Sequence, residues 1–107
     1  MSSLSAAARK GQPVALLLPL TGDRARLGLS MRDAAMLAEK SLEIFDTRGT
    51  AQGARVAADA AMRRRPALIL GPLLSEEVPA VAAAVEGRVP VIAFSNNAVL
   101  RTPGTFI

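Results

Sequence analysis

The chain of 107 residues contains no cysteine and no histidine. Their absence excludes disulfides, thiol catalysis, cysteine/histidine zinc sites and imidazole acid–base chemistry. Tryptophan and tyrosine are also missing and phenylalanine occurs three times, so the chain offers no broad aromatic platform for stacking bases or sugars. We therefore expect no metal site, no cofactor and no catalytic residue, and hence a protein that is not an enzyme.

Long apolar runs are absent as well. A membrane-spanning helix needs about 18 consecutive apolar residues, whereas the run at residues 14–20 contains Pro19 and is much shorter. Residues 1–13 are rich in serine and alanine, and their Arg-Lys pair comes late, which is the wrong order for a secretory signal. We expect no membrane span, and a cytoplasmic location if the chain is expressed as it stands.

Positive charge is in excess, with 13 Lys and Arg residues against 9 Asp and Glu residues. Much of the excess is the run Arg63-Arg64-Arg65. A basic run can bind nucleic acid, but it can also be the end of a helix, where cations offset the helix dipole. Because the run is short and has no interleaved aromatics, we expect exposed arginines and no nucleic-acid partner.

Short apolar runs alternate with segments of helical periodicity. The runs predict strands at residues 14–18, 42–45, 67–70 and 89–94, and the periodicity predicts helices at 27–40, 51–64 and 75–86. Thr50 and Ser75 are the expected N-caps of the second and third helices. This βαβαβαβ order predicts an α/β fold of three layers, with a parallel sheet in the flavodoxin-like order 2-1-3-4. Residues 1–12 are expected to be a flexible leader.

The carboxyl ends of parallel strands are where such sheets bind ligands. Here those ends are residues 21–23, 46–48, 71–75 and 95–97, which are rich in small hydroxyls, amides and helix starts. Backbone N–H groups at helix starts can hold a carboxylate or another polar group. The set holds no obvious pair of nucleophile and base.

Two enzyme motifs are weakly present. Thr21-Gly22 followed by Gly28 resembles part of a dinucleotide-binding loop, but the middle glycine is absent and Arg24, Ala25 and Arg26 occupy the turn. Asp23 and Asp46 could act as a carboxylate pair. Nothing in the sequence places them together, so loop acids beside arginines are the favoured interpretation. A degenerate nucleotide-binding domain remains a less favoured alternative.

Four segments, in the same order, resemble the type I periplasmic binding proteins. They are residues 14–22 with the helix that begins at Leu27-Gly28, the strand that ends at Asp46-Thr47, residues 70–75 (Leu-Gly-Pro-Leu-Leu-Ser) and residues 89–96 (Val-Pro-Val-Ile-Ala-Phe-Ser-Asn). The Gly-Pro-Leu-Leu turn and the compact link to the second strand resemble the penicillin-binding protein activator family of bacterial lipoproteins. The resemblance spans residues 13–107 and implies part of the amino-terminal lobe of a two-lobed protein, and hence a fragment.

This resemblance implies a noncatalytic regulator of peptidoglycan synthesis. Its partner would be a peptidoglycan synthase, and the full-length protein would lie in the periplasm or at the outer membrane. The alternative is the amino-acid-binding component of an ABC transporter, with an amino-acid-like small molecule as its ligand. The ligand-binding residues that the resemblance implies are Thr21, Gly22, Leu73, Leu74, Ser75, Ser95, Asn96 and Asn97.

Two further expectations follow from a single lobe. Half of a cleft buries little ligand surface, so we expect this chain alone to bind small solutes with a Kd near or above about 1 mM. A fifth strand can start only near Phe106. We therefore expect the sheet edge that it should cover to be unpaired and prone to self-association.

Overall fold

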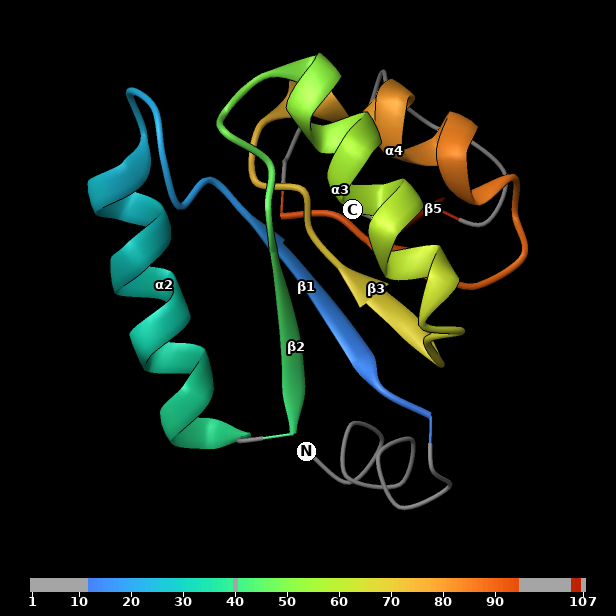
Figure 1. Ribbon diagram of the computed structural model, residues 1–107, viewed down its shortest axis with the longest axis horizontal. Helices are drawn as coiled ribbons and strands as arrows, with labels where there is room; N and C mark the ends of the chain where they lie inside the picture. Colours follow the sequence, from blue (N-terminus) through green and yellow to red (C-terminus); the bar gives the residue numbers. More distant parts are fainter. Residues whose placement is uncertain (1–11, 40, 95–104, 107) are drawn as a thin grey trace.

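A parallel sheet separates two helical layers in the computed structural model, which describes residues 12–39, 41–94 and 105–106 (Figure 1). The strands are β1 (Val14–Leu18), β2 (Leu42–Asp46), β3 (Leu68–Leu70), β4 (Val91–Ile92) and β5 (Thr105–Phe106). The helices are α2 (Ala25–Ala38), α3 (Ala51–Arg63), the 3₁₀ turn η1 (Ser75–Glu77) and α4 (Val78–Val85). The leader expected at residues 1–12 lies outside these residues apart from Gln12.

The strand order β2-β1-β3-β4-β5 confirms the predicted α/β class and the order 2-1-3-4. Each neighbouring pair is parallel, with Val14 opposite both Leu42 and Leu68. The expectation of an unpaired edge beside β4 is wrong, because β5 pairs there, with Thr105 opposite Val91 and Phe106 opposite Ile92. Two residues of the fifth strand suffice, since β4 itself is only two residues long.

The larger core lies between the sheet and helices α3 and α4. Ala15, Leu17, Ile69 and Val91 project from the strands into this layer, and each is at most 4% exposed. Helix α3 meets them with the small side chains Ala54, Ala57, Ala58 and Ala61. Because alanine holds the helix axis close to the sheet, α3 packs on β1 and β2 and lies beside α4.

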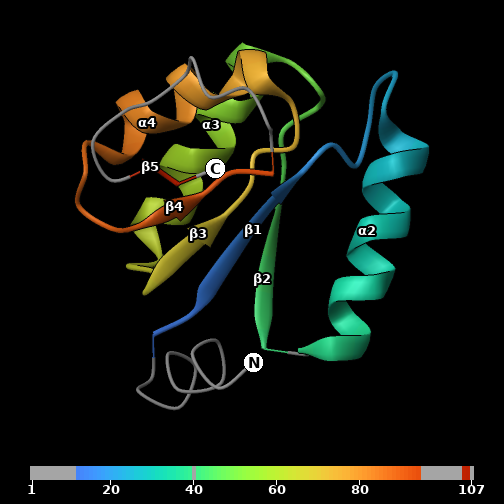
Figure 2. The same cartoon turned by 180° about the vertical axis from the view of Figure 1, so that it is seen from behind.

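A smaller core lies on the opposite face of the sheet, under α2. Val14, Leu16 and Leu18 point to this side and are almost completely buried. Helix α2 covers them with Met31, Ala35 and Met36, which are only partly buried. The two faces of the sheet therefore differ: one carries two helices, and in the described part of the chain the other carries one (Figure 2).

The two predicted N-caps have different outcomes. The hydroxyl of Thr50 accepts a hydrogen bond from the Gly53 N–H at 2.9 Å, so this cap is confirmed. The prediction that Ser75 caps the third helix is wrong. The chain enters through a 3₁₀ turn whose N-cap is Leu74, and the carboxylate of Glu77 accepts from the Leu74 N–H at 3.2 Å. An acid three residues beyond the N-cap thus performs the capping that we expected of the serine.

The arginine run lies at the end of α3. All three arginines are exposed, as predicted, with Arg63 the last helical residue and Arg64 the C-cap. Arg64 binds Glu43 of β2 through two N–H groups, at 2.9 and 3.1 Å, and this pairing lowers the pKa of Glu43. The run therefore ends α3, and Arg64 connects this end of the helix to the edge strand β2.

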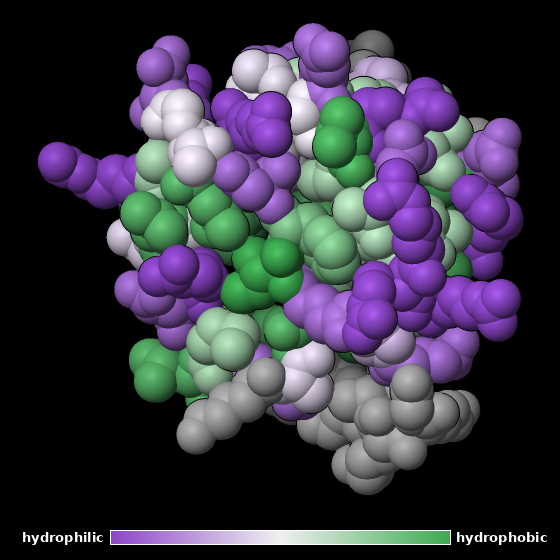
Figure 3. Space-filling view, in the orientation of Figure 1, coloured by the Kyte–Doolittle hydropathy of each residue, from purple (hydrophilic) through white to green (hydrophobic). Residues whose placement is uncertain are grey.

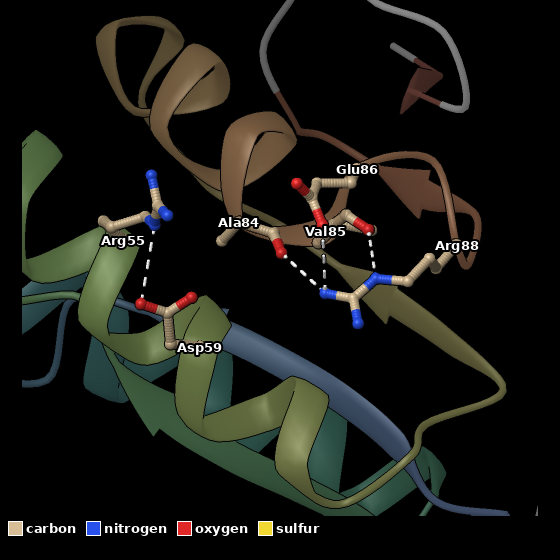
Figure 4. A network of polar contacts seen from close by, with 6 residues as sticks. All are labelled: Arg55, Asp59, Ala84, Val85, Glu86 and Arg88. Carbon is tan, nitrogen blue, oxygen red and sulfur yellow. Dashed lines mark hydrogen bonds and ion pairs between the residues drawn. The ribbon is translucent and has the colours of Figure 1, made fainter.

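A single arginine closes the next helix. Arg88 donates to the carbonyls of Val85 at 3.0 Å and Ala84 at 3.1 Å, and it lies 3.8 Å from Glu86 (Figure 4). These carbonyls belong to the last turn of α4, where helix geometry leaves acceptors unpaired. On the neighbouring helix α3, Arg55 and Asp59 form an exposed pair at 3.5 Å (Figure 4).

Two helical glycines set how closely α2 and α3 approach the strand ends. A Cβ on Gly28 would lie 1.8 Å from the Pro19 carbonyl oxygen, and one on Gly53 would lie 2.1 Å from the Thr47 carbonyl oxygen. No side chain fits at either distance. Gly28, which the sequence placed in a weak dinucleotide motif, therefore has a packing role.

We predict that Gly53→Ala destabilises the protein. Helix propensity alone favours alanine by about 0.5–1 kcal/mol, but forcing a Cβ against a fixed carbonyl costs typically about 1–3 kcal/mol. The clash is severe, so we expect a net loss of about 2 kcal/mol in the free energy of unfolding, measured by denaturant titration. Gln52→Ala, on the exposed neighbour, should stay within about 0.5 kcal/mol. An unchanged or increased stability of Gly53→Ala would contradict the packing described above.

Candidate functional site

The candidate site is the edge of the sheet where β1, β2 and β3 end. Helices α2, α3 and the turn η1 all begin there, at the top of Figure 1. Thr21 and Gly22 follow β1, and residues 73–75 lead from β3 into η1. The structure thus puts five of the eight sequence-predicted residues on one edge. The other three, Ser95, Asn96 and Asn97, lie outside the described residues.

Asp46, the last residue of β2, ties the end of β1 to the end of β2. Its Oδ1 accepts from the N–H groups of Leu20 at 2.8 Å, Thr21 at 3.3 Å and Arg48 at 2.8 Å. Its Oδ2 accepts from the Thr21 hydroxyl at 2.7 Å. Burial raises the pKa of Asp46, but the hydrogen bonds from Thr21, Arg48 and Leu20 outweigh it and hold the pKa below its ordinary value.

This arrangement explains Asp46 without acid–base chemistry. Asp23, the other member of the hypothetical carboxylate pair, is exposed and is not among the hydrogen-bond partners of Asp46. Arg48 binds Asp46 through its backbone N–H, not through its guanidinium. Asp46 therefore shapes the loops as a turn-binding carboxylate, a role that the sequence interpretation missed.

Glu77, in η1, continues this connection to the end of β3. Its side chain is fully buried. Oε1 accepts from the Leu74 N–H at 3.2 Å, and Oε2 has no partner among the described residues. Burial raises the pKa of Glu77. Hydrogen bonds to Leu74 and Thr47 lower it less, and the charge of Glu76 raises it further.

The sequence interpretation did not single out Glu77. It treated Glu76 and Glu77 together as acids of a first helical turn, since nothing local distinguishes an exposed acid from a buried one. The available signal was spacing, because in a capping box the acid three residues after the N-cap accepts a hydrogen bond from the N-cap backbone N–H. Only the packing of η1 in the folded chain decides which of the two acids is buried, and it buries Glu77.

The rim offers few groups to a ligand. The Thr21 hydroxyl already donates to Asp46, so it presents lone pairs. A Cβ on Gly22 would lie 2.7 Å from the Arg48 carbonyl oxygen, so this position has no room for a side chain. Gly22 can therefore contact a ligand only through its backbone. Ser75 is half-buried, and its hydroxyl makes no hydrogen bond to the described part of the chain. Within that part, no three Asp or Glu residues group as metal ligands would.

Comparison with known proteins identifies the fold. Neither a protein-family model nor a curated protein matches the chain. Among solved structures the chain is similar to a leucine-binding protein from Thermotoga maritima, with a TM-score of 0.68 and 24% identical residues over 77% of this chain. The chain spans 27% of the length of that protein. None of the helices in the described residues combines the length and apolar character that a membrane crossing requires. The similarity shows the periplasmic-binding-protein-like fold that the sequence predicted.

We predict that Asp46→Ala lowers the free energy of unfolding by about 2–4 kcal/mol, because four hydrogen bonds of roughly 0.5–1.5 kcal/mol each are lost. Asp46→Asn keeps an acceptor for the three N–H groups and should cost about 1 kcal/mol. The lowered pKa means that the carboxylate stabilises the fold above its ordinary value of 3.8, and that this contribution is lost as pH falls through the folded pKa. Denaturant unfolding at pH 7 and below pH 4 should therefore show the difference between wild type and Asp46→Asn shrinking in acid.

The buried Glu77 should have the opposite pH dependence. Its pKa is raised in the folded state, so its ionisation destabilises the fold: stability is full below the ordinary value of 4.5 and falls as pH rises through the folded pKa. Gln cannot ionise, so Glu77→Gln should be more stable than wild type at pH 7, by about 1 kcal/mol or more, and equal to it near pH 4. Glu76→Gln, on the exposed neighbour, is the control. If the free energies of unfolding of the wild type and of Glu77→Gln changed in parallel with pH, the idea that Glu77 is buried and ionises would be wrong.

Proposed function

We propose that this chain is a noncatalytic binding module that contacts a small, amino-acid-like solute at the carboxyl edge of its sheet. The observation that carries the proposal is the gathering of Thr21, Gly22, Leu73, Leu74 and Ser75 on the edge where parallel α/β sheets hold ligands. The similarity to a leucine-binding protein supports an amino acid as the class of solute.

The chemistry of the rim suits the carboxylate end of such a solute. Ser75 has a hydroxyl that is not used within the described part of the chain, and it stands where η1 and α4 begin. Free N–H groups and the helix dipole at such a start favour a negative charge. Leu73 and Leu74 are half-buried beside it and can pack against an apolar side chain of the solute.

Solute capture is favoured over regulation of a peptidoglycan synthase. The activator interpretation rests on the Gly-Pro-Leu-Leu turn and the link to β2, whereas the similar solved structure is a leucine-binding protein. We place the full-length protein in the periplasm, and we assign it to solute transport.

Titration of the chain with L-leucine, followed by ¹⁵N NMR, tests this proposal. We expect shifts confined to residues 21–22 and 73–75, with a Kd near or above about 1 mM because one lobe covers one side of the solute. Ser75→Ala should weaken binding about two- to tenfold, the equivalent of one hydrogen bond. Ser30→Ala, an exposed serine of α2 away from this edge, should have no effect.

Three outcomes would refute the proposal. The first is the absence of shifts at saturating leucine and at an equal excess of other amino acids. The second is a set of shifts at the opposite edge of the sheet. The third is an equal loss of affinity in the Ser75→Ala and Ser30→Ala variants. Micromolar affinity would contradict the weak binding expected of a single lobe.

A further inference from the structure

Thr21 gives both of its hydrogen-bond donors to Asp46. Its N–H nitrogen lies 3.3 Å from Oδ1, and its hydroxyl oxygen lies 2.7 Å from Oδ2. A threonine side chain has one O–H donor and two acceptor lone pairs. Since that donor is already used, the side chain of Thr21 can only accept a hydrogen bond from a ligand.

The carboxylate of Asp46 fixes this direction. Three backbone N–H groups donate to Oδ1, which orients the carboxylate and leaves Oδ2 for the Thr21 hydroxyl. The pKa of Asp46 lies below its ordinary value of 3.8, so near neutral pH the group is ionised and has no hydrogen to donate in return. If the hydroxyl turned to donate to a ligand, it would lose a hydrogen bond to a charged group, which is stronger than one between neutral groups.

The hydroxyl lies where a solute at the carboxyl edge of the sheet can reach it. Thr21 is exposed in the loop between β1 and α2. Figure 3 shows mainly hydrophilic side chains along this edge, at the top of the view. Thr21 thus offers lone pairs, backed by the negative charge of Asp46, to a group that carries hydrogens and positive charge.

The other charged groups near this loop are acidic on the loop itself and basic toward β2. Asp23 is exposed and is not a hydrogen-bond partner of Asp46. Arg48 follows β2, and the Cγ of Arg24 lies 3.8 Å from where a Cβ on Gly49 would stand. Because the strand order is β2-β1-β3, the loop after β3 is on the other side of β1. The stem of Arg24 therefore lies over the loop after β2, away from the loop after β3.

We propose that the lone pairs of Thr21 bind the ammonium group of the solute, so that the site selects an α-amino acid over the 2-oxo acid of the same shape. This inference rests on the proposed function, in which Ser75 and the start of α4 bind the carboxylate. Thr21 and Ser75 follow the neighbouring strands β1 and β3, and an α-amino acid carries its ammonium and its carboxylate on one carbon. Asp46 makes no contact with the solute and is a positioning residue.

The group on the 2-carbon of the solute decides the order of affinities. An ammonium group has hydrogens to donate to Thr21, whereas a 2-oxo group has only lone pairs, which would face those of the hydroxyl. A site built to bind a donor rejects the analogue that lacks it, because its own polar group is then left unpaired. A 2-hydroxy acid keeps one donor but has no positive charge, so it should bind with intermediate affinity.

Titration with three ligands of one shape, followed by ¹⁵N NMR at pH 7, tests this order. The ligands are L-leucine, L-2-hydroxy-4-methylpentanoate and 4-methyl-2-oxopentanoate. We expect the oxo acid to bind about three- to tenfold more weakly than leucine, the effect of one hydrogen bond that is open to water on one side, and the hydroxy acid to lie between them.

Variants at the two residues test the cause of the discrimination. Thr21→Val should bring the ratio of the leucine and oxo-acid affinities to about one, and Thr21→Ser should restore it. In Asp46→Asn the amide carbonyl can replace Oδ1, which turns the NH₂ group toward Thr21 and frees the hydroxyl hydrogen to donate to a ligand. We therefore expect the ratio to fall in Asp46→Asn, with the oxo acid bound at least as tightly as by the wild type. A purely structural role of Asp46 would weaken all three ligands equally and leave the ratio unchanged.

Asp23→Asn is the matched control, because it removes one negative charge from the same loop and leaves the bond between Thr21 and Asp46 in place. Its affinity ratio should equal that of the wild type. Equal affinities for leucine and the oxo acid, with shifts at residues 21–22 and 73–75 for both, would overturn this inference and leave the proposed function intact. A ratio that persists in Thr21→Val, or that falls as much in Asp23→Asn as in Asp46→Asn, would also overturn it. The absence of shifts with every ligand would refute the proposed function, and the inference with it.

Discussion

The arrangement of the candidate site depends on two carboxyl groups that connect three crossover loops. Asp46 accepts hydrogen bonds from the loop after β1 and from its own loop after β2, and Glu77 accepts from the Leu74 N–H at the entry of η1 after β3. Loops carry backbone donors that need acceptors once water is excluded. A carboxylate satisfies several of them at once, which is why single side chains can position the rim. The two groups differ in environment: well-paired Asp46 ionises easily, and buried Glu77 resists ionisation.

The sizes of the side chains between helix and sheet decide how closely each face of the sheet is covered. Helix α3 approaches closely through alanines and Gly53, and with α4 it seals one side of β1, β3 and β4. Helix α2 approaches at its start through Gly28, and it covers the other side with methionine and alanine over β1 and β2. A parallel sheet is stable when both of its faces are covered. On this side of the sheet, Ile92 and Phe94 remain 40% and 38% exposed.

The described part of the rim holds two kinds of polar group. The polar groups there either hold other loops in place, as Thr21 does for Asp46, or offer a hydroxyl and backbone N–H groups, as Ser75 does. Groups of this kind orient a ligand and bind its charge. Their contribution grows when a second surface excludes water from the other side of the ligand, since hydrogen bonds strengthen at low dielectric.

The sequence by itself determined the fold class, the strand order of the sheet and the ends of β1 and α3. Unbroken apolar runs, helical periodicity and caps such as Thr50 are local signals, and one right-handed topology joins them. It also placed the candidate site at one edge of the sheet. Tertiary structure decided what local signals do not contain: that Asp46 binds the loop after β1, that Glu77 and not Glu76 is buried, and that β5 covers the edge of β4. The physical reason is that burial and hydrogen-bond partners come from residues that are distant in the sequence, such as Thr21, which is 25 positions from Asp46.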